Sequence, residues 1–596
     1  MLIPFTIVDP CREDLAIRIK QGFEENFADA IPSLSQPLTD ALIYQMIEVP
    51  TEQSMGDYAL PCFRFSKALK KSPEAIAETL AKSLNQNKGR WLSEAKNVKA
   101  FLNLTIHPST LGQDLLPKVA SGEFFEIGHA HPKLENVMIE FSQPNTHKEF
   151  HVGHMRNVAL GDCLCHLFRY LGYPLVAVNY IGDEGTHIAK CLWYLRKENP
   201  PVPSEQRGAW LGQMYTRATQ LLDQADDVEK KRFEVEISEV LQALEEGKEP
   251  LYGLWKETKQ WSMEAFHEIY DWLNVKFDKI FYESEVSEES QKIVDEYLER
   301  GIFYESQGAI GIDLKPYGIP FLMLRKSNGT SLYATKDLAL AQKKFEEYRI
   351  THSIYVVGSE QDLHFRQVFK TLELMGFPQA KNCHHLSYGL VELPEGKMSS
   401  RKGNTIAFNR LKEKLSEKLD GPLSKYKSEW SEEEYTGTRQ KLAVGAIKYG
   451  MLETDPVKNI VFDMEEWLSF EGNTGPYLMY SYARTKSILR KAEEMGSKPS
   501  LGSIEKLTER PVFSLLKDIR KFNEVVLQAA LQLKPSLLTT HLYEMCKEFN
   551  RFYTELPVLK AEDENTRTAR LMLVDAFSKT LYKGLGLLGI TPPERM

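Results

Sequence analysis

The sequence predicts an α/β protein with a doubly wound parallel sheet at its centre, between a small α/β unit and an all-α part. Three observations predict this fold class. Apolar strands alternate with a crossover helix from Val137 onwards, the first ~125 residues mix helical and strand periods, and nearly everything beyond ~435 has helical spacing. A chain of 596 residues is long enough for three domains.

Composition restricts the class of protein. The hydrophobic content of 42% and charged content of 26% are those of soluble globular proteins, and no apolar run reaches the ~20 residues of a membrane span. We therefore expect a cytoplasmic protein. The formal charge of −9 argues against a uniformly basic nucleic-acid binder, although a local basic patch remains compatible with it. Seven scattered cysteines without a CxxC pair predict neither a disulfide framework nor a structural metal site.

The first unit, residues 1–128, opens with a helix whose apolar residues recur every fourth position: Leu15, Ile19, Phe23 and Phe27. Ser72 is an expected N-cap, with Pro73 at the first helical position. The stretch "KAFLNLTIH" alternates like a strand.

The second unit, residues 129–430, begins with the strand Val137 to Phe141, followed by a helix after Gly153 and the strand "PLVAVNYIGD". This β–α–β order predicts parallel strands in a Rossmann-type sheet. An acidic, Trp-rich helical stretch at about 200–300 is expected to be an insertion, because strand patterns return after it. Residues 431–596 form the predicted all-α unit.

Three histidines lie close together in "FSQPNTHKEFHVGHMRN", and three interpretations compete for His151 and His154. A zinc pair is the weakest, because zinc pairs on helices usually sit four residues apart with an acidic partner. The two residues could also be ordinary polar residues at a helix N-terminus, without a chemical role. In the third interpretation, the helix N-terminus and two imidazoles bind phosphate, while Gly153 lets a purine approach the backbone.

A second basic segment, "KMSSRKGN", lies far downstream. Its cations on a Ser/Gly-rich backbone suit a loop that closes on pyrophosphate, although such a loop read alone is most often solvated surface. The HxGH helix and this loop, in this order around a split sheet, together indicate a nucleotide site much more specifically than either does alone.

The two segments resemble the HIGH and KMSKS signatures of class I aminoacyl-tRNA synthetases. "FSQPNTHKEFHVGHMR", "SLYATKD", "GSEQDLHF", "FEGNTGPYLMYSYARTKSILRK" and the ending "LLGITPPERM" are similar to blocks of the arginyl-tRNA synthetase family, and the likeness covers nearly the whole chain. The resemblance implies an arginine–tRNA ligase with an N-terminal tRNA-binding domain, a Rossmann-type catalytic domain and a helical anticodon-binding domain. It implies ATP with substrate-bound Mg²⁺, L-arginine and tRNA-Arg as ligands, no structural metal, no membrane association, and a monomer.

The resemblance also implies site residues. The catalytic residues would be His151, Gly153, His154 and Lys397. The ATP contacts would add Gly358, Glu360, Met398 and Ser399. Arginine would be bound by Gln143, Asn145, His154, Glu283, Tyr333, Asp337 and Gln361, with Asp337 on the guanidinium group. The tRNA contacts would include Tyr477, Tyr480 and Arg484, which at spacings of 3 and 4 share one helix face suited to unstacked bases. A buried tyrosine pair with a surface arginine is an equally good interpretation of this last group.

The chain departs from the family pattern at several positions. Gln143 replaces a serine, which puts the contact to the substrate amino group in doubt. "GDEGTH" replaces GDWGTQ through Glu184 and His187, and Ser400 and Arg401 replace residues of KMSKS, with Lys402 as a candidate replacement for the lost charge. Two alternatives to an active arginine–tRNA ligase follow: a synthetase for another amino acid, and a catalytically silent paralogue that binds tRNA as a regulator.

Overall fold

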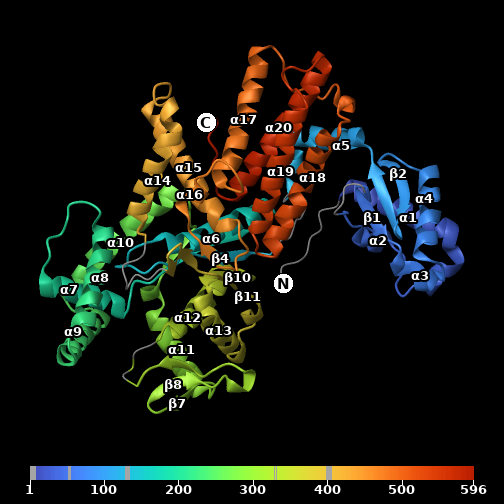
Figure 1. Ribbon diagram of the computed structural model, residues 1–596. Helices are drawn as coiled ribbons and strands as arrows, with labels where there is room; N and C mark the ends of the chain where they lie inside the picture. Colours follow the sequence, from blue (N-terminus) through green and yellow to red (C-terminus); the bar gives the residue numbers. More distant parts are fainter. Residues whose placement is uncertain (1–8, 51–54, 128–134, 328, 330–331, 398–405) are drawn as a thin grey trace.

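The computed structural model describes residues 9–50, 55–127, 135–327, 329, 332–397 and 406–596. A five-stranded sheet lies at the centre, helices of the C-terminal part stand beside it, and the N-terminal unit lies at one side of the molecule (Figure 1). The connecting segment is helix α5 (Pro108–Ser121). Among the described residues, no helix combines the length and apolar character that a membrane crossing requires.

The N-terminal unit is an antiparallel sheet covered by helices, with strand order β1-β3-β2. The predicted apolar face of α1 is confirmed, because all four of its residues are buried: Leu15, Ile19, Phe23 and Phe27. Ser72 Oγ accepts a hydrogen bond from the Ala75 backbone N–H at 3.2 Å, which confirms the predicted cap. The elements are α1 (Pro10–Phe27), α2 (Asp40–Met46), β1 (Tyr58–Pro61), α3 (Phe63–Leu69), α4 (Pro73–Gln86), β2 (Leu92–Val98) and β3 (Phe101–Ile106).

The central sheet is entirely parallel and has the order β11-β10-β4-β5-β6, so the predicted parallel sheet is confirmed. Its strands are β4 (Val137–Glu140), β5 (Leu175–Ile181), β6 (Lys279–Tyr282), β10 (His352–Gly358) and β11 (Cys383–Tyr388). The crossover helix between β4 and β5 is α6 (Val152–Tyr170). Because β5 lies on one side of β4 and the much later β10 on the other, the strand order reverses there. Ligands of open α/β sheets bind at such a reversal, outside the carboxyl ends of the strands.

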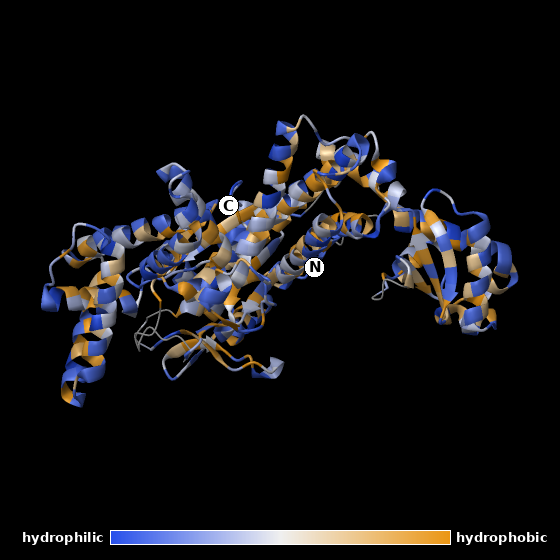
Figure 2. Cartoon of the chain, turned by 45° about the horizontal axis from the view of Figure 1, so that its top comes forward, coloured by the Kyte–Doolittle hydropathy of each residue, from blue (hydrophilic) through white to orange (hydrophobic). Residues whose placement is uncertain are grey.

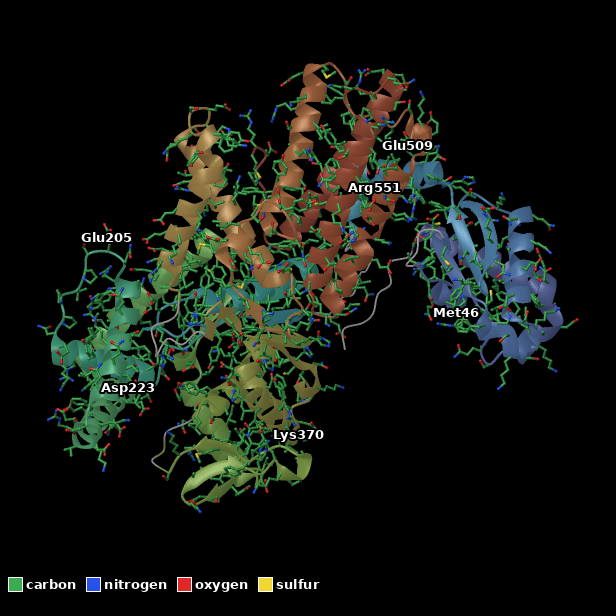
Figure 3. All side chains as sticks on the ribbon, viewed as in Figure 1. Met46, Glu205, Asp223, Lys370, Glu509 and Arg551 are labelled. Carbon is green, nitrogen blue, oxygen red and sulfur yellow. The ribbon has the colours of Figure 1, made fainter. Side chains whose placement is uncertain are left out.

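The expected helical insertion is present but ends earlier than the sequence indicates. Its helices are α7 (Thr186–Glu198), α8 (Arg207–Gln224), α9 (Asp227–Glu245) and α10 (Leu251–Leu273). The edge strand β6 lies inside the range 200–300 that was expected to be helical. The sequence did not reveal it, because four residues between long helices are too few for a visible alternation. The exposed Glu205 and Asp223 lie on the insertion, on the opposite side of the molecule from Met46 of the N-terminal unit (Figure 3).

After β6 the chain forms a small antiparallel sheet and returns to the central one. The elements are α11 (Ser287–Glu299), β7 (Tyr304–Ser306), β8 (Ala309–Ile312), β9 (Leu322–Arg325), α12 (Tyr333–Tyr348) and α13 (Asp362–Leu374). A second small sheet has the order β13-β12-β14, with β12 (Val391–Leu393), β13 (Gly396–Lys397) and β14 (Ile460–Val461).

The C-terminal part is a helical bundle, as predicted. Its helices are α14 (Phe408–Leu423), α15 (Glu432–Leu452), α16 (Met464–Trp467), α17 (Gly475–Glu494), α18 (Arg510–Leu531), α19 (Ser536–Glu555) and α20 (Glu564–Leu587). Hydrophobic and hydrophilic residues alternate along these helices, as expected for helices that bury one face (Figure 2). The domain limits near 128 and 430 stay predictions.

Helix α18 joins the bundle to the N-terminal unit by ion pairs. Arg520 Nη2 lies 2.7 Å from Asp9 Oδ1, and Lys517 Nζ lies 3.0 Å from Asp57 Oδ1. Lysine and arginine are three residues apart and therefore share one face of α18. These contacts orient the N-terminal unit relative to the bundle.

Candidate active site

The loop between β4 and α6 carries the first signature and is held by two asparagines. Ser142 and Gln143 have positive φ angles of 77° and 45°, a conformation that costs free energy for residues other than glycine. Their backbone N–H groups donate to Asn157 Oδ1 at 2.6 Å and Asn179 Oδ1 at 3.0 Å. Contacts from α6 and β5 therefore offset the strain and fix the course of the loop.

The Gln143 side chain points into a buried polar network below this loop. Its Nε2 donates to Glu140 Oε1 at 3.0 Å, and its Oε1 accepts from Asn157 Nδ2 at 3.1 Å. Glu140 in turn forms a buried ion pair with Lys344. Both ends of the amide are thus engaged, and the predicted contact of Gln143 with a ligand would require it to leave this network.

Helix α6 begins with a capping box made by the two signature histidines. His151 Nδ1 accepts from the Gly153 backbone N–H at 3.2 Å, and His154 Nδ1 accepts from the His151 backbone N–H at 3.1 Å. Because each Nδ1 is an acceptor, the proton of each neutral ring is on Nε2. The caps therefore orient two Nε2–H donors beside the first turn of α6, with ring centroids 3.9 Å apart.

Both imidazoles are neutral at neutral pH. Burial lowers the pKa of His151 to about 4. Burial, followed by the charges of His151 and Lys148, holds the pKa of His154 well below its usual range. Neutral donors at a helix N-terminus suit phosphoryl oxygens. Among the described residues, no group of three or more His, Cys, Asp or Glu side chains is placed to hold a metal ion.

His147 lies in the same signature and serves the fold. Its ring is fully buried, with Nε2 2.8 Å from Thr258 Oγ1, and its backbone N–H donates to Ser262 Oγ at 3.0 Å. Both partners lie on α10. His147 therefore joins the insertion to the signature loop.

Both flanks of the second signature are anchored. On one side, Lys397 ends β13, which pairs with β12 through Glu392. On the other, the Val152 backbone N–H donates to the Ile406 carbonyl at 3.0 Å, and Ala407 forms a β-bridge with His151. The segment therefore returns to the start of α6. The predicted residues Met398 and Ser399 lie outside the described residues, as do Ser400, Arg401 and Lys402.

Asn145 and Glu283 meet around Gly182, directly after β5. Asn145 forms a parallel bridge with Gly182, and a Cβ atom on this glycine would come within 2.3 Å of Asn145 Oδ1. The same point is 3.5 Å from Glu283 Oε1. Only glycine at position 182 leaves room for the amide beside the carboxylate.

The first turn of α12 contacts the residues that directly follow β5 and β6. Tyr333 Oη lies 3.4 Å from the position that a Cβ atom on Gly185 would take. Lys336 Nζ donates to Glu184 Oε2 at 2.7 Å and lies 3.5 Å from Glu283 Oε2. Glu184, the carboxylate that departs from the family pattern, is thus paired with a cation. Lys336 therefore offsets the negative charge that this departure adds to the site.

Asp337 lies on the same turn of α12 and is oriented by a histidine. His364 Nε2 lies 2.5 Å from Asp337 Oδ2. Burial lowers the pKa of His364, but the hydrogen bond and the charge of Asp337 outweigh it and raise the pKa overall. Oδ1 takes no hydrogen bond from the described residues, so it remains available for a cationic ligand.

Three further predicted residues lie at the end of β10, on the other side of the strand-order reversal. Gly358 ends the strand in register with Tyr388, and the short turn Ser359–Gln361 follows. The side chains of Glu360 and Gln361 are exposed there. They lie at the carboxyl edge of the sheet, where the signature loop and the ends of β5 and β6 also lie.

Comparisons with known families match three parts of the chain. Residues 121–464 match the family described as "tRNA synthetases class I (R), catalytic domain". Residues 478–596 match the DALR anticodon binding domain, and residues 19–106 match the arginyl-tRNA synthetase N-terminal domain. A protein from Bdellovibrio bacteriovorus named arginine–tRNA ligase is 44% identical over 574 residues, which cover 95% of this chain and 96% of that protein.

The chain belongs to the arginyl-tRNA synthetase family. An arginine–tRNA ligase from Halothermothrix orenii is 34% identical, covering 96% of this chain and all of that one. Among solved structures, the arginyl-tRNA synthetase of Thermus thermophilus superposes with a TM-score of 0.78 at 28% identity, covering 98% of this chain and 100% of that chain. The enzyme from Plasmodium falciparum, at 21% identity and a TM-score of 0.74, shares the fold.

The tRNA-contact candidates of this arginyl-tRNA synthetase family member lie on α17. Tyr477 Oη accepts from Asn550 Nδ2 at 2.8 Å, and Arg484 Nη1 donates to Asn550 Oδ1 at 3.1 Å. Arg484 also lies over the ring of Tyr553, 4.9 Å from its centroid. Tyr480 is the exposed member, at 41%. Tyr477 and Arg484 thus contact α19, whereas the side chain of Tyr480 is exposed.

Sequence reasoning did not single out two residues of the synthetase site, Lys336 and His364. Lys336 directly precedes Asp337, and its pairing with Glu184 joins positions 152 residues apart. His364 follows Gln361 in the quoted block "GSEQDLHF", and its contact with Asp337 spans 27 residues. The only signal in the sequence was that each is a polar residue inside a stretch similar to the family, Lys336 in "SLYATKD" and His364 in "GSEQDLHF".

Proposed function

We propose that this enzyme, an arginine–tRNA ligase, uses the carboxyl edge of the central sheet for both steps of its reaction. The observation that carries the assignment of the site is one juxtaposition. A helix N-terminus with two neutral imidazole donors and the carboxylates Asp337 and Glu283 lie at the same carboxyl edge of the central sheet. The first suits a triphosphate and the second suits a guanidinium group.

In the first step, a carboxylate oxygen of arginine attacks the α-phosphorus of ATP. The bond to the bridging oxygen breaks, pyrophosphate leaves, and arginyl-adenylate forms without a covalent bond to the enzyme. His151 and His154 donate through Nε2–H to phosphoryl oxygens as their negative charge rises. Lys397 and the segment after it supply positive charge to the departing pyrophosphate.

In the second step, a hydroxyl of the terminal adenosine of tRNA-Arg attacks the carbonyl carbon of arginyl-adenylate. AMP leaves with the electron pair of the broken C–O bond, and the hydroxyl proton is lost. Positioning is the main contribution of the protein, because both reacting groups are already activated.

Arginine lies across the ends of β5 and β6 in this proposal. Asp337 binds the guanidinium group, Tyr333 covers it, and Glu283 adds a second carboxylate. Asn145 and His154 hold the amino and carboxylate end, and Gln361 approaches from β10.

ATP lies at the other side of the reversal, with its phosphates at the start of α6. Gly153, His151 and His154 contact the phosphates and adenine, while Gly358 and Glu360 lie at the ribose. Lys397, Met398 and Ser399 of the second signature contact ATP in this proposal. Mg²⁺ enters bound to the phosphates and keeps most of its water ligands, as is usual for this ion.

The helical bundle binds the anticodon, with Tyr480 as the exposed stacking residue and Tyr477 and Arg484 on the same helix. The N-terminal unit contacts the elbow of the tRNA. We further propose domain limits of 1–128, 129–430 and 431–596, a monomer, and a cytoplasmic location.

An aminoacylation screen tests this function. With ATP, Mg²⁺ and tRNA-Arg, we expect charging with arginine and with none of the other standard amino acids. Pyrophosphate exchange should depend on arginine and require tRNA-Arg. Charging with another amino acid would reassign the substrate, and tRNA binding without any charging would indicate a silent paralogue.

Arginine binding is expected to release a proton through Glu283. Burial raises the pKa of this carboxyl to about 8, Lys336 lowers it, and Asp337, Asp183 and Glu184 raise it. The carboxyl is therefore largely protonated at pH 7 in the free enzyme, and a bound guanidinium favours its ionised form. Arginine affinity should rise as the pH increases from about 6 to about 8.

Calorimetry in two buffers with different ionisation enthalpies measures the released proton at pH 7. We expect a release approaching one proton for the wild type and almost none for Glu283→Gln. Equal release by the two proteins would assign the proton to another group.

A further inference from the structure

Three buried polar atoms near the proposed arginine site have no hydrogen-bond partner among the described residues. They are Tyr180 Oη, His187 Nε2 and Glu283 Oε2. The residues His187 and Glu283 are each only 7% exposed. Buried polar atoms in native proteins are nearly always hydrogen-bonded. Glu283 Oε2 has only an ion pair with Lys336 at 3.5 Å, so three atoms without a hydrogen bond in this part of the fold point to a missing partner.

Tyr180 is the penultimate residue of strand β5, on the sheet face that packs against α12. Burial raises the pKa of its hydroxyl well above the usual value, and the carboxylates that raise it further are, in order of effect, Asp337, Glu283, Glu140 and Asp183. In the sheet, Tyr180 pairs with Phe281 of β6, two residues before Glu283, and its hydroxyl has no hydrogen-bond partner among the described residues.

His187 lies in the first turn of α7, directly after the Gly185 turn. Its Nδ1 is 3.8 Å from the position of a Cβ atom on Gly185, and Tyr333 Oη is 3.4 Å from the same position. Burial holds the pKa of His187 well below its usual range. The charges of Lys148 and Lys336 act in the same direction, and a hydrogen bond with the Gly182 backbone acts in the opposite direction. The ring is thus neutral beside Tyr333, with Nε2 unpaired.

The missing partner must be able to bond to a phenol, an imidazole and a carboxylate at once. A guanidinium group has five N–H donors in a fixed plane and no acceptor. Asp337 offers one oxygen to such a group, because its other oxygen is bonded to His364. Acidic groups with acceptor atoms that lack a hydrogen bond match a donor-only cation and would repel a phosphate.

We propose that Tyr180 and His187 contact the bound arginine directly, Tyr180 through its hydroxyl oxygen and His187 through Nε2. This inference rests on the proposed function, and it adds two specificity-determining residues from the β5–α7 connection. Both lie within or beside the block "NYIGDEGTH", where the glutamine of the family pattern is replaced by His187.

The inference predicts opposite effects on stability and binding for Tyr180→Phe. The free enzyme loses an unpaired hydroxyl, so its melting temperature should not fall. Bound arginine loses a hydrogen bond, so its KM should rise about 10-fold, with the KM for ATP unchanged. Tyr449→Phe is the matched control, because that buried hydroxyl is 2.6 Å from Asn473 Oδ1 in the helical bundle. It should lower the melting temperature and leave the KM for arginine unchanged.

At position 187, two variants separate the effect of losing the hydrogen-bond acceptor from the effect of changing the side-chain volume. His187→Gln keeps a polar acceptor and should bind arginine nearly as well as the wild type. His187→Leu removes the acceptor and should raise the KM for arginine about 10-fold. Equal KM values for the two variants would overturn the assignment of Nε2.

For Tyr180, an unchanged KM for arginine in Tyr180→Phe would mean that the hydroxyl is satisfied by water and would overturn the inference. A lower melting temperature of this variant would do the same, since it would reveal a structural partner. In either case the wild type would still charge tRNA with arginine, so the proposed function would stand. Failure of the wild type to charge arginine would refute the function itself.

Discussion

Replacing Asp337 by asparagine is expected to lower kcat/KM for arginine by about three orders of magnitude. The guanidinium group is planar and permanently charged, and a carboxylate matches both properties. Asp337 Oδ2 is bonded to His364, which leaves Oδ1 for the substrate. Asparagine keeps an acceptor for His364 but removes the charge, so a bound guanidinium would lose its ionic partner. Most of the loss should appear in the KM for arginine.

Aminoacylation at saturating ATP and tRNA-Arg measures this effect. The KM for ATP should stay within about twofold, because the phosphates lie at α6. Glu347→Gln is a control on the same helix, where Glu347 forms only a surface pair with Lys343 at 3.5 Å. A normal KM for arginine in Asp337→Asn would refute the assigned role, and an equal loss in Glu347→Gln would attribute the effect to α12 as a whole.

Two substitutions of His154 separate the roles of its ring nitrogens. Asparagine can place an oxygen near the position of Nδ1, which accepts from the His151 backbone N–H, but it has no donor at the position of Nε2. We expect His154→Asn to keep its stability and to lose about 10²–10³ in kcat, the usual effect of removing one donor to a developing negative charge. Glutamine reaches the Nε2 position but does not reproduce the cap. His154→Gln should therefore retain more activity and lose about 1 kcal/mol of stability.

Arginine-dependent pyrophosphate exchange in the presence of tRNA-Arg, combined with thermal unfolding, measures both quantities. His166→Asn is the control on α6, since His166 is partly exposed and lies 3.5 Å from Asp162. The same kcat in the Asn and Gln variants of His154 would show that Nε2–H is not the catalytic donor.

Much of the fold follows from local sequence patterns. The buried face of α1, the cap of α4 at Ser72 and the parallel order of β4, α6 and β5 depend on residues that are close together in the chain. The edge strand β6 was hidden, because four residues after the long helix α10 give no readable period. Only its hydrogen bonds with β5 place it in the sheet.

The candidate site divides in the same way. The HxGH segment at the start of a helix and the position of Asp337 one turn after Tyr333 could be predicted, because a cap and a helix face are local features. The pairing of Glu184 with Lys336 could not be predicted from spacing, because it joins residues 152 positions apart. The residue roles themselves remain predictions for the variants described above.

Sequence alone determined which residue types are available and where the helices and strands begin. It identified His151 and His154 as candidates through the HxGH pattern, and Asn145 and Asp337 through the resemblance to the family. The tertiary structure decided which way the side chains point: Gln143 toward the buried Glu140–Lys344 pair, and His147 toward α10. The physical reason is that caps and periodicity involve neighbours in the chain. Hydrogen bonds and desolvation, in contrast, depend on partners brought together only when the sheet and its helices pack.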